Sequence, residues 1–170
     1  MLFRFKNMKK LLSILVVLFV FSLTSCQNSG KSTVSQNTKH LTQKQLIAFN
    51  RKLVRQEKRE IDTFIRVHHW NMRESGTGLR YQILVKGKGP KAHTGQIAKI
   101  RYSVELFDGQ KIYSGVKSFK IGFGGVESGL EEGILLLKTG DKAKFILPSH
   151  LAYGLSGDGD KIPPHMPIIY

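Results

Sequence analysis

Two runs of alternating apolar and polar residues, joined by a tight turn, constrain the fold of this chain most. Residues 97–106 read IAKIRYSVEL and lead through Asp108-Gly109 into the second run, QKIYS. Alternation with period two is typical of a strand with one buried face, and Asp-Gly is a signal of a hairpin turn. Residues 80–85, RYQILV, form a further apolar run. The pattern predicts an antiparallel meander.

The period of the apolar residues changes once after these strands. Within VESGLEEGILLLKTGD they recur at helical spacing, at Leu130, Ile134 and Leu137. Ser128 and Glu131 fit a capping box, and Gly140 is a suitable C-cap. We expect a helix of about two to three turns here, with a strand at residues 142–147 after it. One short helix against an antiparallel sheet predicts an α+β fold.

The first 25 residues have the features of a targeting segment. A basic stretch precedes LLSILVVLFVFSL, which has the length of a signal-peptide core and is short for a membrane span. Next comes Leu-Thr-Ser-Cys, which resembles the lipobox of bacterial lipoproteins, and Cys26 is the only cysteine in the chain. We expect residues 1–25 to be a signal peptide and Cys26 to carry a lipid that anchors the protein to the membrane. A buried thiol behind an ordinary cleavage site is the alternative, and both Met1 and Met8 are suitable starts.

Residues 26–40 and 41–75 differ sharply in composition. The first segment is rich in Ser, Asn and Thr, lacks aromatic residues, and predicts a flexible tether. The second contains an amphipathic helical pattern over residues 41–69, with Thr42 as a suitable N-cap. Its apolar positions are Leu46, Phe49, Leu53, Ile61, Phe64 and Ile65. We expect this stripe to pack on the domain, or on a second copy of the chain in a homodimer, rather than on a membrane, because acids and bases mix on its polar side.

The charge balance is strongly basic. The chain has 27 Lys and Arg against 12 Asp and Glu, a net charge of +15. Such an excess attracts anionic partners. The bases are nevertheless spread along the chain without interleaved aromatic residues, so we expect a solvated surface and no nucleic-acid partner.

Common catalytic and metal-binding motifs are incomplete in this sequence. The Gly-rich stretch GFGGVESG has Glu127 where a GxGxxG loop requires glycine. Asp158-Gly159-Asp160 is not followed by the glutamate of a calcium loop, and the 6 histidines lack metal-ligand spacing. A single cysteine excludes a disulfide within the chain. We therefore expect neither a metal nor a cofactor.

From Tyr81 to Tyr170 the chain resembles the FKBP-type peptidyl-prolyl cis-trans isomerases. The matching blocks, in the family's order, are RYSVEL, FDGQKI, VESGLEEGILLLKTGDKAKFILPSHLAYG and KIPPHMPIIY. The resemblance implies, for residues 76–170, an antiparallel half-barrel sheet wrapped around one short helix. It also implies that the last strand continues beyond Tyr170, so we expect the sequence to be a fragment. With the Cys26 motif and the helical prefix, the resemblance is closest to the FKBP-type lipoproteins linked to bacterial gliding motility.

The resemblance further implies a site for an X-Pro peptide. In the family, the tyrosine of Ala-Tyr-Gly donates a hydrogen bond over the pocket, the next loop forms a flap, and the isoleucine before Pro-Pro forms a wall. The backbone N–H before the helix binds a substrate carbonyl; here it belongs to Glu127, so we expect that side chain's identity to matter less. The implied catalytic residues are Tyr102, Tyr113, Val126, Glu127, Tyr153 and Ile162. The implied substrate contacts are Ile112, Phe119, Leu130, Asp158 and Tyr170.

The function implied is isomerisation of X-Pro bonds in proline-containing clients of the cell envelope, by a protein anchored on the periplasmic side or at the outer membrane. The sequence departs from the family where Leu130 replaces a tryptophan, Ile112-Tyr113 replaces Phe-Asp, and Lys117 occupies an aromatic position. We expect Tyr113→Asp, which restores the family residue, to raise activity. These departures keep open a proline-binding chaperone or assembly module of low activity, or a structural subunit of a surface machine.

Overall fold

The structure is a computed structural model that describes residues 42–170. The predicted signal peptide, the tether and Cys26 lie outside the described residues. Within the described part, none of the helices combines the length and hydrophobicity that crossing a bilayer requires.

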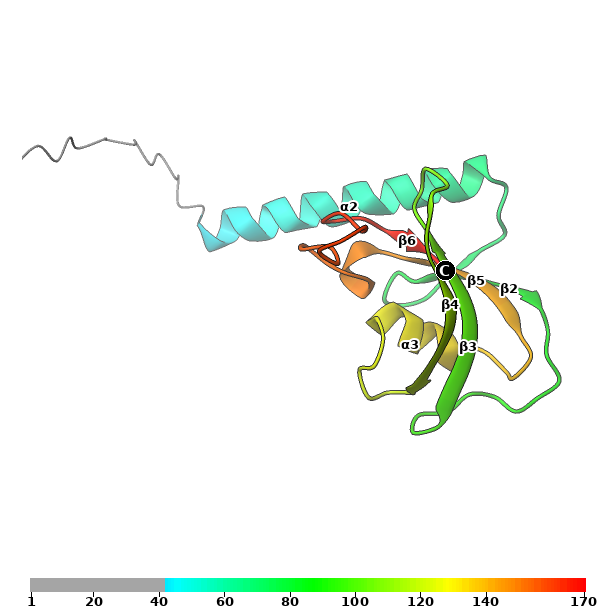
Figure 1. The fold of residues 1–170 in the computed structure, drawn as a ribbon. Coiled ribbons are helices and arrows are strands. Elements are labelled where there is room, and N and C mark those ends of the chain that lie inside the picture. Colours follow the sequence, from blue (N-terminus) through cyan, green and yellow to red (C-terminus); the bar gives the residue numbers. More distant parts are fainter. Residues whose placement is uncertain (1–41) are drawn as a thin grey trace, which may run out of the picture. The chain divides into compact units, whose positions relative to one another are not determined.

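A 6-stranded antiparallel sheet organises the described part of the chain, with strand order β1-β2-β5-β6-β3-β4 (Figure 1). The strands are β1 (Arg73–Glu74), β2 (Arg80–Val85), β3 (Ile97–Glu105), β4 (Lys111–Lys120), β5 (Lys142–Leu147) and β6 (Ile168–Ile169). The helices are α2 (Gln43–Val67), α3 (Ser128–Leu135) and the short 3-10 helix η1 (Ser149–Leu151). This arrangement confirms the α+β prediction, including the N-terminal helix.

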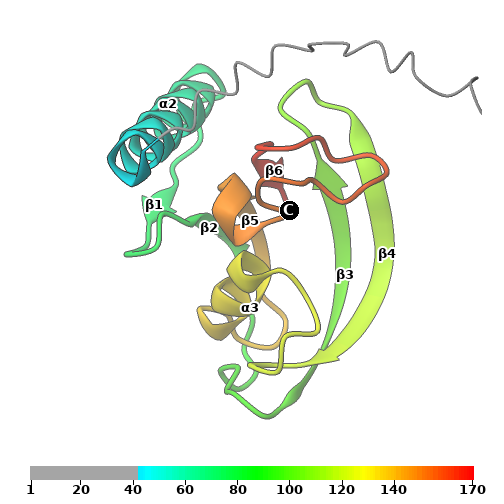
Figure 2. The same cartoon turned by 90° about the vertical axis from the view of Figure 1, so that its left-hand side faces the viewer.

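The β3–β4 hairpin forms where the alternating runs predicted it. The strands pair from Ile97 opposite Lys120 to Glu105 opposite Lys111. In the turn, Gly109 has a φ of 84°, and the Asp108 carboxylate accepts the Gln110 N–H at 2.8 Å. β4 runs well beyond the expected QKIYS, and both strands curve around α3 (Figure 2). This curvature creates the half-barrel on whose inner side α3 lies.

The ends of α3 differ from the sequence-based expectation. Its N-cap is Glu127 rather than Ser128, and no side chain caps the helix. The predicted capping box was wrong because its two residues bond elsewhere: Ser128 Oγ donates to the Leu151 carbonyl at 3.4 Å, and Glu131 accepts the Gly124 N–H at 2.9 Å. Gly140 is not the C-cap either, because the helix ends earlier and Gly140 lies in the turn before β5.

Two glycines let α3 lie close against β5. A Cβ on Gly129 would lie 2.6 Å from Leu147 Cγ, and one on Gly133 would lie 2.9 Å from Phe145 Cε1. These distances are shorter than van der Waals contacts allow, so any larger residue would push the helix away from the sheet. The close approach fixes the start of α3, and with it Glu127 and Leu130, relative to the sheet.

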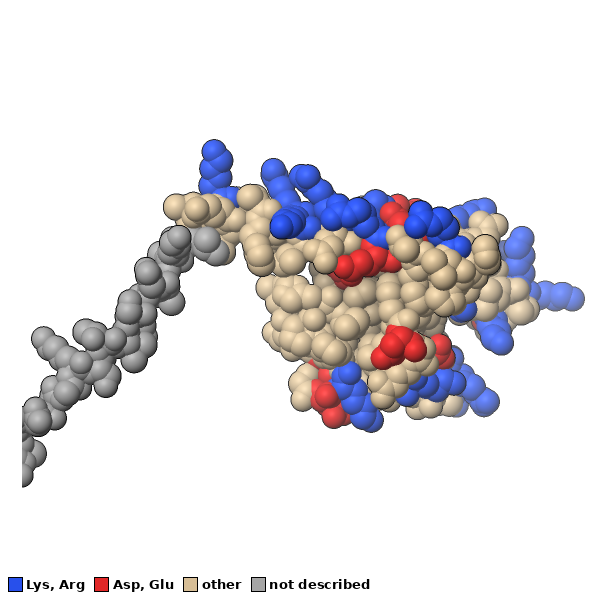
Figure 3. Space-filling model, turned by 90° about the horizontal axis from the view of Figure 1, so that it is seen from above, with Lys and Arg blue, Asp and Glu red and all other residues tan. Residues whose placement is uncertain are grey.

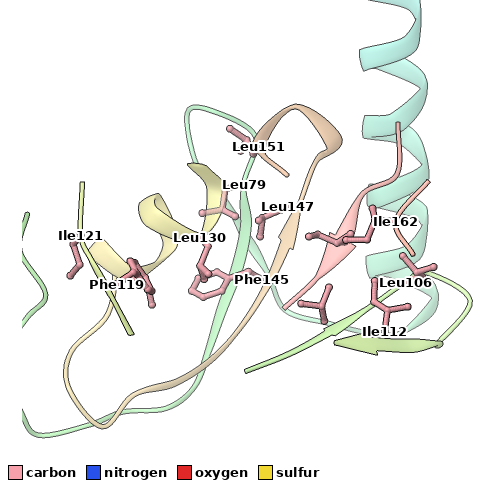
Figure 4. Packing of buried hydrophobic residues seen from close by; sticks show 13 residues of the cluster. Leu79, Leu106, Ile112, Phe119, Ile121, Leu130, Phe145, Leu147, Leu151 and Ile162 are labelled. Carbon is pink, nitrogen blue, oxygen red and sulfur yellow. The ribbon is translucent and has the colours of Figure 1, made fainter. Parts of the chain in front are cut away.

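The sheet separates two hydrophobic clusters. Alternate residues of β5 point to opposite faces: Phe145 and Leu147 join the α3 cluster, whereas Ile146 joins Ile61 of α2. Figure 4 shows Leu130 of α3 between Phe119 and Phe145 in the larger cluster. The sheet therefore has α2 on one face and α3 on the other.

Polar contacts fasten α2 to the domain. Its predicted N-cap, Thr42, forms a capping box with Gln45, and its buried residue Ile61 reaches the sheet. The Glu57 carboxylate accepts the backbone N–H of Ser149 at 2.5 Å and its hydroxyl at 3.0 Å. The Arg80 side chain, only 5% exposed, pairs with Asp62 and Glu74, each at 2.8 Å. These contacts turn acids of α2 towards the domain and leave bases on its outer side (Figure 3).

Candidate functional site

The structure brings the predicted site residues together on the face of the sheet that holds α3. The buried members come from β4, α3 and the loop before β6, and are Ile112, Phe119, Leu130 and Ile162. The half-buried members pack against the same cluster, and are Tyr102, Tyr113, Val126, Tyr153 and Tyr170. Figure 4 places Ile162 on the same side of the cluster as Leu106 and Ile112. Their roles stay predictions, but their assembly from distant parts of the chain is a property of the fold.

Glu127 connects three of the elements that form this site. Its Oε1 accepts a short hydrogen bond from the Tyr153 hydroxyl, which follows η1. Its Oε2 accepts one from the Tyr170 hydroxyl at 2.9 Å. Tyr170 is held in turn by a pair of backbone hydrogen bonds with Phe145 of β5, each 2.9 Å long. The carboxylate therefore ties the start of α3 to both tyrosines.

This environment keeps both tyrosines protonated. Burial, together with the hydrogen bond and the charge of Glu127, raises the pKa of Tyr153. Burial and the negative charge of Glu127 likewise raise the pKa of Tyr170. Both hydroxyls therefore remain hydrogen-bond donors throughout the physiological pH range.

The expectation that the identity of the Glu127 side chain matters less stays a prediction, but it did not foresee the contacts of this side chain. It overlooked that a long acidic side chain at the start of α3 can reach the Tyr153 hydroxyl, the group expected to bind substrate. Spacing in the sequence does not show this, because these residues lie 26 positions apart. The backbone N–H of Glu127 fits its expected role better: no acceptor within residues 42–170 bonds to it.

Asp158 organises the loop that precedes Ile162. Its Oδ1 accepts backbone N–H groups of Asp160 at 2.9 Å, Lys161 at 2.9 Å and Ile162 at 2.7 Å. Its Oδ2 accepts the Tyr113 hydroxyl from β4 at 2.5 Å. A Cβ on Gly157, whose φ is 70°, would collide with the Ile162 carbonyl, so this loop needs glycine there. One carboxylate thus shapes the loop and holds it against β4.

The Tyr113–Asp158 contact is stable over a wide pH range. Partial burial works against ionisation of Asp158, but the Tyr113 hydroxyl and the three backbone N–H groups outweigh it and lower its pKa to about 2. The hydrogen bond to Asp158 raises the pKa of Tyr113 to about 12. The donor stays protonated and the acceptor stays charged under all ordinary conditions.

Other charged groups around the site are the Asp160 carboxylate, 3.4 Å from the Tyr113 hydroxyl, and two lysines that lie over aromatic rings. Lys117 Nζ is 5.9 Å from the centre of the Tyr102 ring, and Lys161 Nζ is 5.1 Å from that of Tyr113. Tyr102 and Tyr170 contact each other with ring centres 5.9 Å apart. The arrangement offers apolar and aromatic surface, hydroxyl donors and a free backbone N–H. Within residues 42–170, no three His, Cys, Asp or Glu side chains are grouped as metal ligands would be.

A groove on the other face of the sheet is the rival candidate. It lies along the C-terminal half of α2 beside Phe107, has a volume of about 520 Å³, and is wide open to solvent. Phe64 and Phe107, two of its lining residues, stack with ring centres 4.2 Å apart. The groove includes none of the predicted site residues, and its aromatic side chains already pack against each other.

The chain is similar to proteins of one enzyme family. The sequence profile described as FKBP-type peptidyl-prolyl cis-trans isomerase matches residues 89–170. Over 85 residues the chain is 40% identical to the FK506-binding protein 2 of Dictyostelium discoideum, covering 47% of this chain and 64% of that protein. Over 104 residues it is 34% identical to the probable FKBP-type peptidyl-prolyl cis-trans isomerase FkpA of Neisseria meningitidis, covering 58% of this chain and 38% of that protein. The chain thus spans less than two thirds of the length of these relatives.

Solved structures resemble the fold as well. The crystal structure of AtFKBP13 superposes with a TM-score of 0.56 at 33% identity, covering 58% of this chain and 92% of that one. The peptidyl-prolyl cis-trans isomerase of Pseudomonas syringae superposes with a TM-score of 0.58 at 27% identity, covering 68% and 88%. The structural similarity therefore extends over nearly all of each matched domain.

Proposed function

We propose that this chain, whose residues 89–170 form an FKBP-type peptidyl-prolyl cis-trans isomerase domain, catalyses the rotation of X-Pro bonds in polypeptide clients. The observation that carries the proposal is the convergence of the family's site residues on one face of the sheet. Tyr102 of β3, Val126 before α3, and Ile162 and Tyr170 near the chain's end pack against one cluster.

The chemistry of the site suits a rotation in which no covalent bond breaks. The barrier to rotation is about 18–20 kcal/mol because amide resonance is lost midway. A twisted amide is less polar than a planar one, so an apolar, partly dry site favours it relative to water. In the proposed mechanism, the free N–H of Glu127 holds a substrate carbonyl, and Ile162 supplies an apolar wall. This mechanism requires neither a nucleophile nor a metal.

The test is an isomerisation assay of the full chain in detergent on a Leu-Pro tetrapeptide. We expect rate acceleration that a macrolide inhibitor of FKBP-type sites abolishes. Ile162→Ala should lower kcat/KM, whereas Lys142→Ala, an exposed change on β5, should not. A wild-type rate equal to the uncatalysed rate would refute the isomerase function.

One observation favours a second function, a proline-binding chaperone or assembly module of low activity. The Tyr153 hydroxyl, which the family uses at the substrate, is bonded to Glu127. A site whose donor is occupied can still bind a proline segment on its apolar surface. In that case client aggregation is suppressed, Ile162→Ala weakens the suppression, and isomerase rates stay near background in every variant.

The proposed location is the bacterial cell envelope, with the protein anchored through a lipid on Cys26. The proposal rests on the signal-like first 25 residues and the Leu-Thr-Ser-Cys motif. The exposed bases of α2 that form no ion pair within residues 42–170 also suit a position near an anionic membrane surface; they are Lys44, Arg51, Lys52, Arg55, Arg59 and Arg66. Cys26→Ser should release the protein from the membrane or leave its signal peptide uncleaved. Membrane attachment of the processed variant would refute the anchor.

The proposed clients are proline-containing envelope or surface proteins, including those of a gliding or other surface machinery, as the resemblance to gliding-associated lipoproteins suggests. A homodimer through α2 is part of this proposal, because its first half leaves apolar side chains exposed, namely Leu46, Ile47, Phe49 and Val54. Phe49→Glu should then convert a dimer into a monomer in light-scattering measurements. A monomeric wild type would refute the dimer.

A further inference from the structure

A half-buried carboxylate distinguishes the candidate site from a purely apolar one. Glu127 precedes the first turn of α3, yet its side chain does not cap that helix. Each of its oxygens instead accepts one hydroxyl hydrogen bond, from Tyr153 and from Tyr170. Neutral hydroxyl groups solvate a negative charge but do not neutralise it.

No Lys, Arg or His within residues 42–170 forms an ion pair with Glu127. The ion pairs of the described part join Lys58, Arg80 and Lys111 to other acids. The lysines beside the site, Lys117 and Lys161, lie over tyrosine rings. Carboxylates that are removed from water are usually paired with a positive charge. The missing partner of Glu127 can therefore come from a bound polypeptide.

We infer that Glu127 makes the site select polypeptides in which a lysine or arginine lies directly beside the proline. The inference rests on the isomerase function proposed above and names the substrate class of that same site. A cationic side chain next to the proline would lie against the carboxylate while the proline ring occupies the apolar cluster. The partly dry surroundings strengthen this attraction relative to an exposed ion pair.

The same ion pair also makes a hydrogen-bond donor available. A hydroxyl bonds more strongly to a carboxylate than to a neutral carbonyl, so a neutral peptide competes poorly with Glu127 for the Tyr153 hydroxyl. A substrate cation that forms an ion pair with the Glu127 carboxylate weakens the hydrogen bond between this carboxylate and the Tyr153 hydroxyl. The hydroxyl can then turn to the substrate carbonyl. A cationic substrate thus gains both in binding and in access to the donor.

The experiment compares kcat/KM for tetrapeptides that differ beside the proline: Lys-Pro, Leu-Pro and Glu-Pro, and a matched set with Lys, Leu or Glu after the proline. For the full-length wild type at low salt, we expect Lys to exceed Leu by about fivefold at one of the two positions, and Glu to be the poorest. Because salt screens ion pairs, the preference should shrink at about 1 M ionic strength. A merely structural role of Glu127 would produce no such salt dependence.

Two variants locate the effect. Glu127→Gln keeps the shape, the backbone N–H and the hydrogen-bond acceptor but removes the charge, so the Lys over Leu preference should fall to about one. Glu132→Gln is the matched control, because it removes a carboxylate of the same helix that bonds to Thr77 instead, and should keep the preference. Circular dichroism verifies that both variants are folded.

The outcomes separate this inference from the function on which it rests. Equal wild-type rates on the Lys, Leu and Glu peptides at low salt, with clear acceleration of all of them, would overturn the inference and leave the isomerase function intact. The wild-type series decides this even where Glu127→Gln fails to fold. Absence of acceleration on every peptide would overturn both. A preference that survives in folded Glu127→Gln would assign cation selection to another group.

Discussion

The two faces of the sheet employ carboxylates in opposite ways. On the α2 face, Asp62 and Glu74 pair with cations, chiefly with the buried guanidinium of Arg80. On the α3 face, Glu127 and Asp158 bond to tyrosine hydroxyls and, for Asp158, to backbone N–H groups. The buried guanidinium on the α2 face is therefore paired with acids, whereas Glu127 and Asp158 on the α3 face are solvated by neutral donors and form no ion pair within residues 42–170.

This difference separates a scaffold from a site. Paired charges and the contacts of Ile61 hold α2 to the sheet, so these groups are already used in packing. The α3 face retains a free N–H, hydroxyl donors and a carboxylate, all of which a bound polypeptide can engage. Substitutions on the α2 face should accordingly change stability, and those on the α3 face should change catalysis.

The largest expected effect is on stability, from Ile61→Ala. Ile61 is 1% exposed and fills the α2 cluster with Ile146 and Ile169. Removing it should lower the free energy of unfolding by about 2–5 kcal/mol in urea titrations, while kcat/KM of the folded protein stays unchanged. Leu130→Ala, on the opposite face, should cost a similar amount and also lower kcat/KM.

Val54→Ala provides the matched control for Ile61→Ala. Val54 lies on the same helix but is 53% exposed, so its truncation should change stability by no more than about 0.5 kcal/mol. A loss of kcat/KM in folded Ile61→Ala would break the separation between scaffold and site.

The next effect concerns the ion pairs around Arg80. Arg80→Met should destabilise the protein at pH 7 by about 1–2 kcal/mol, less than for a fully buried pair, because Asp62 and Glu74 are nearly half exposed. Arg101→Met, a change of an exposed base on β3, should have little effect. Urea titrations at several pH values measure both.

The pH dependence of Arg80→Met gives a sharper test. Partial burial opposes ionisation of Asp62, but Arg80 and Lys58 outweigh it and lower its pKa; the hydrogen bond from Lys58, with Arg80, lowers the pKa of Glu74. Lowered values mean that this stabilisation is complete above the ordinary values of 3.8 and 4.5 and is lost as the pH falls below them. The difference between wild type and variant should therefore shrink towards pH 3. An equal difference at pH 7 and pH 3 would show that the ion pairs contribute nothing.

On the α3 face, Tyr113 should have an intermediate effect. Tyr113→Phe removes the hydroxyl that holds the Asp158 loop and should lower kcat/KM about threefold. Tyr113→Asp should lower it more, about tenfold, because two carboxylates would then face each other. This prediction is the opposite of the expectation from the resemblance, that restoring the family's aspartate raises activity, and the assay decides between the two. Tyr81→Phe, which removes a hydroxyl away from this loop, is the control.

The hydrogen bond between Tyr113 and Asp158 should be insensitive to pH in the range of the activity assay. The lowered pKa of Asp158, about 2, means that its contribution is lost only as the pH falls from about 4 towards 2. The raised pKa of Tyr113, about 12, means that its contribution is lost only as the pH rises from about 10 towards 12. The ratio of wild-type to Tyr113→Phe activity should therefore be constant from pH 5 to pH 9, and a ratio that changes there would contradict this assignment.

Local sequence patterns predicted the elements of the fold. The polar contacts of the site were not predicted, because they join residues that are far apart in the sequence. The Asp108-Gly109 hairpin, the Thr42 cap and the helix of α3 follow from spacing within a few residues, and all were found. The bonds of Glu127 to Tyr153 and of Tyr113 to Asp158 join residues 26 and 45 positions apart, and only the folded sheet brings them together. Family resemblance indicated which residues assemble, but not which hydroxyl each carboxylate would bind.

The smallest expected effect, from Tyr153→Phe, tests the competition between Glu127 and substrate. Loss of the hydroxyl should lower kcat/KM on a Leu-Pro peptide about twofold, near the lower end of the range of about 0.5–1.5 kcal/mol for a hydrogen bond, because Glu127 already engages this donor. Tyr170→Phe removes the other hydroxyl that bonds to the same carboxylate and should have a smaller effect, because only the Tyr153 hydroxyl is expected to reach the substrate.

A double variant tests the competition directly. In the wild type, the Tyr153 hydroxyl bonds to the Glu127 carboxylate for part of the time, so only part of its hydrogen-bond energy is available to the substrate. In Glu127→Gln the neutral amide competes less, so Tyr153→Phe should cost more there than in the wild type. An equal loss of kcat/KM on Tyr153→Phe in the wild type and in Glu127→Gln would show that Glu127 does not compete with the substrate for the Tyr153 hydroxyl. The α3 face would then differ from the α2 face in the pairing of its charges but not in its chemistry.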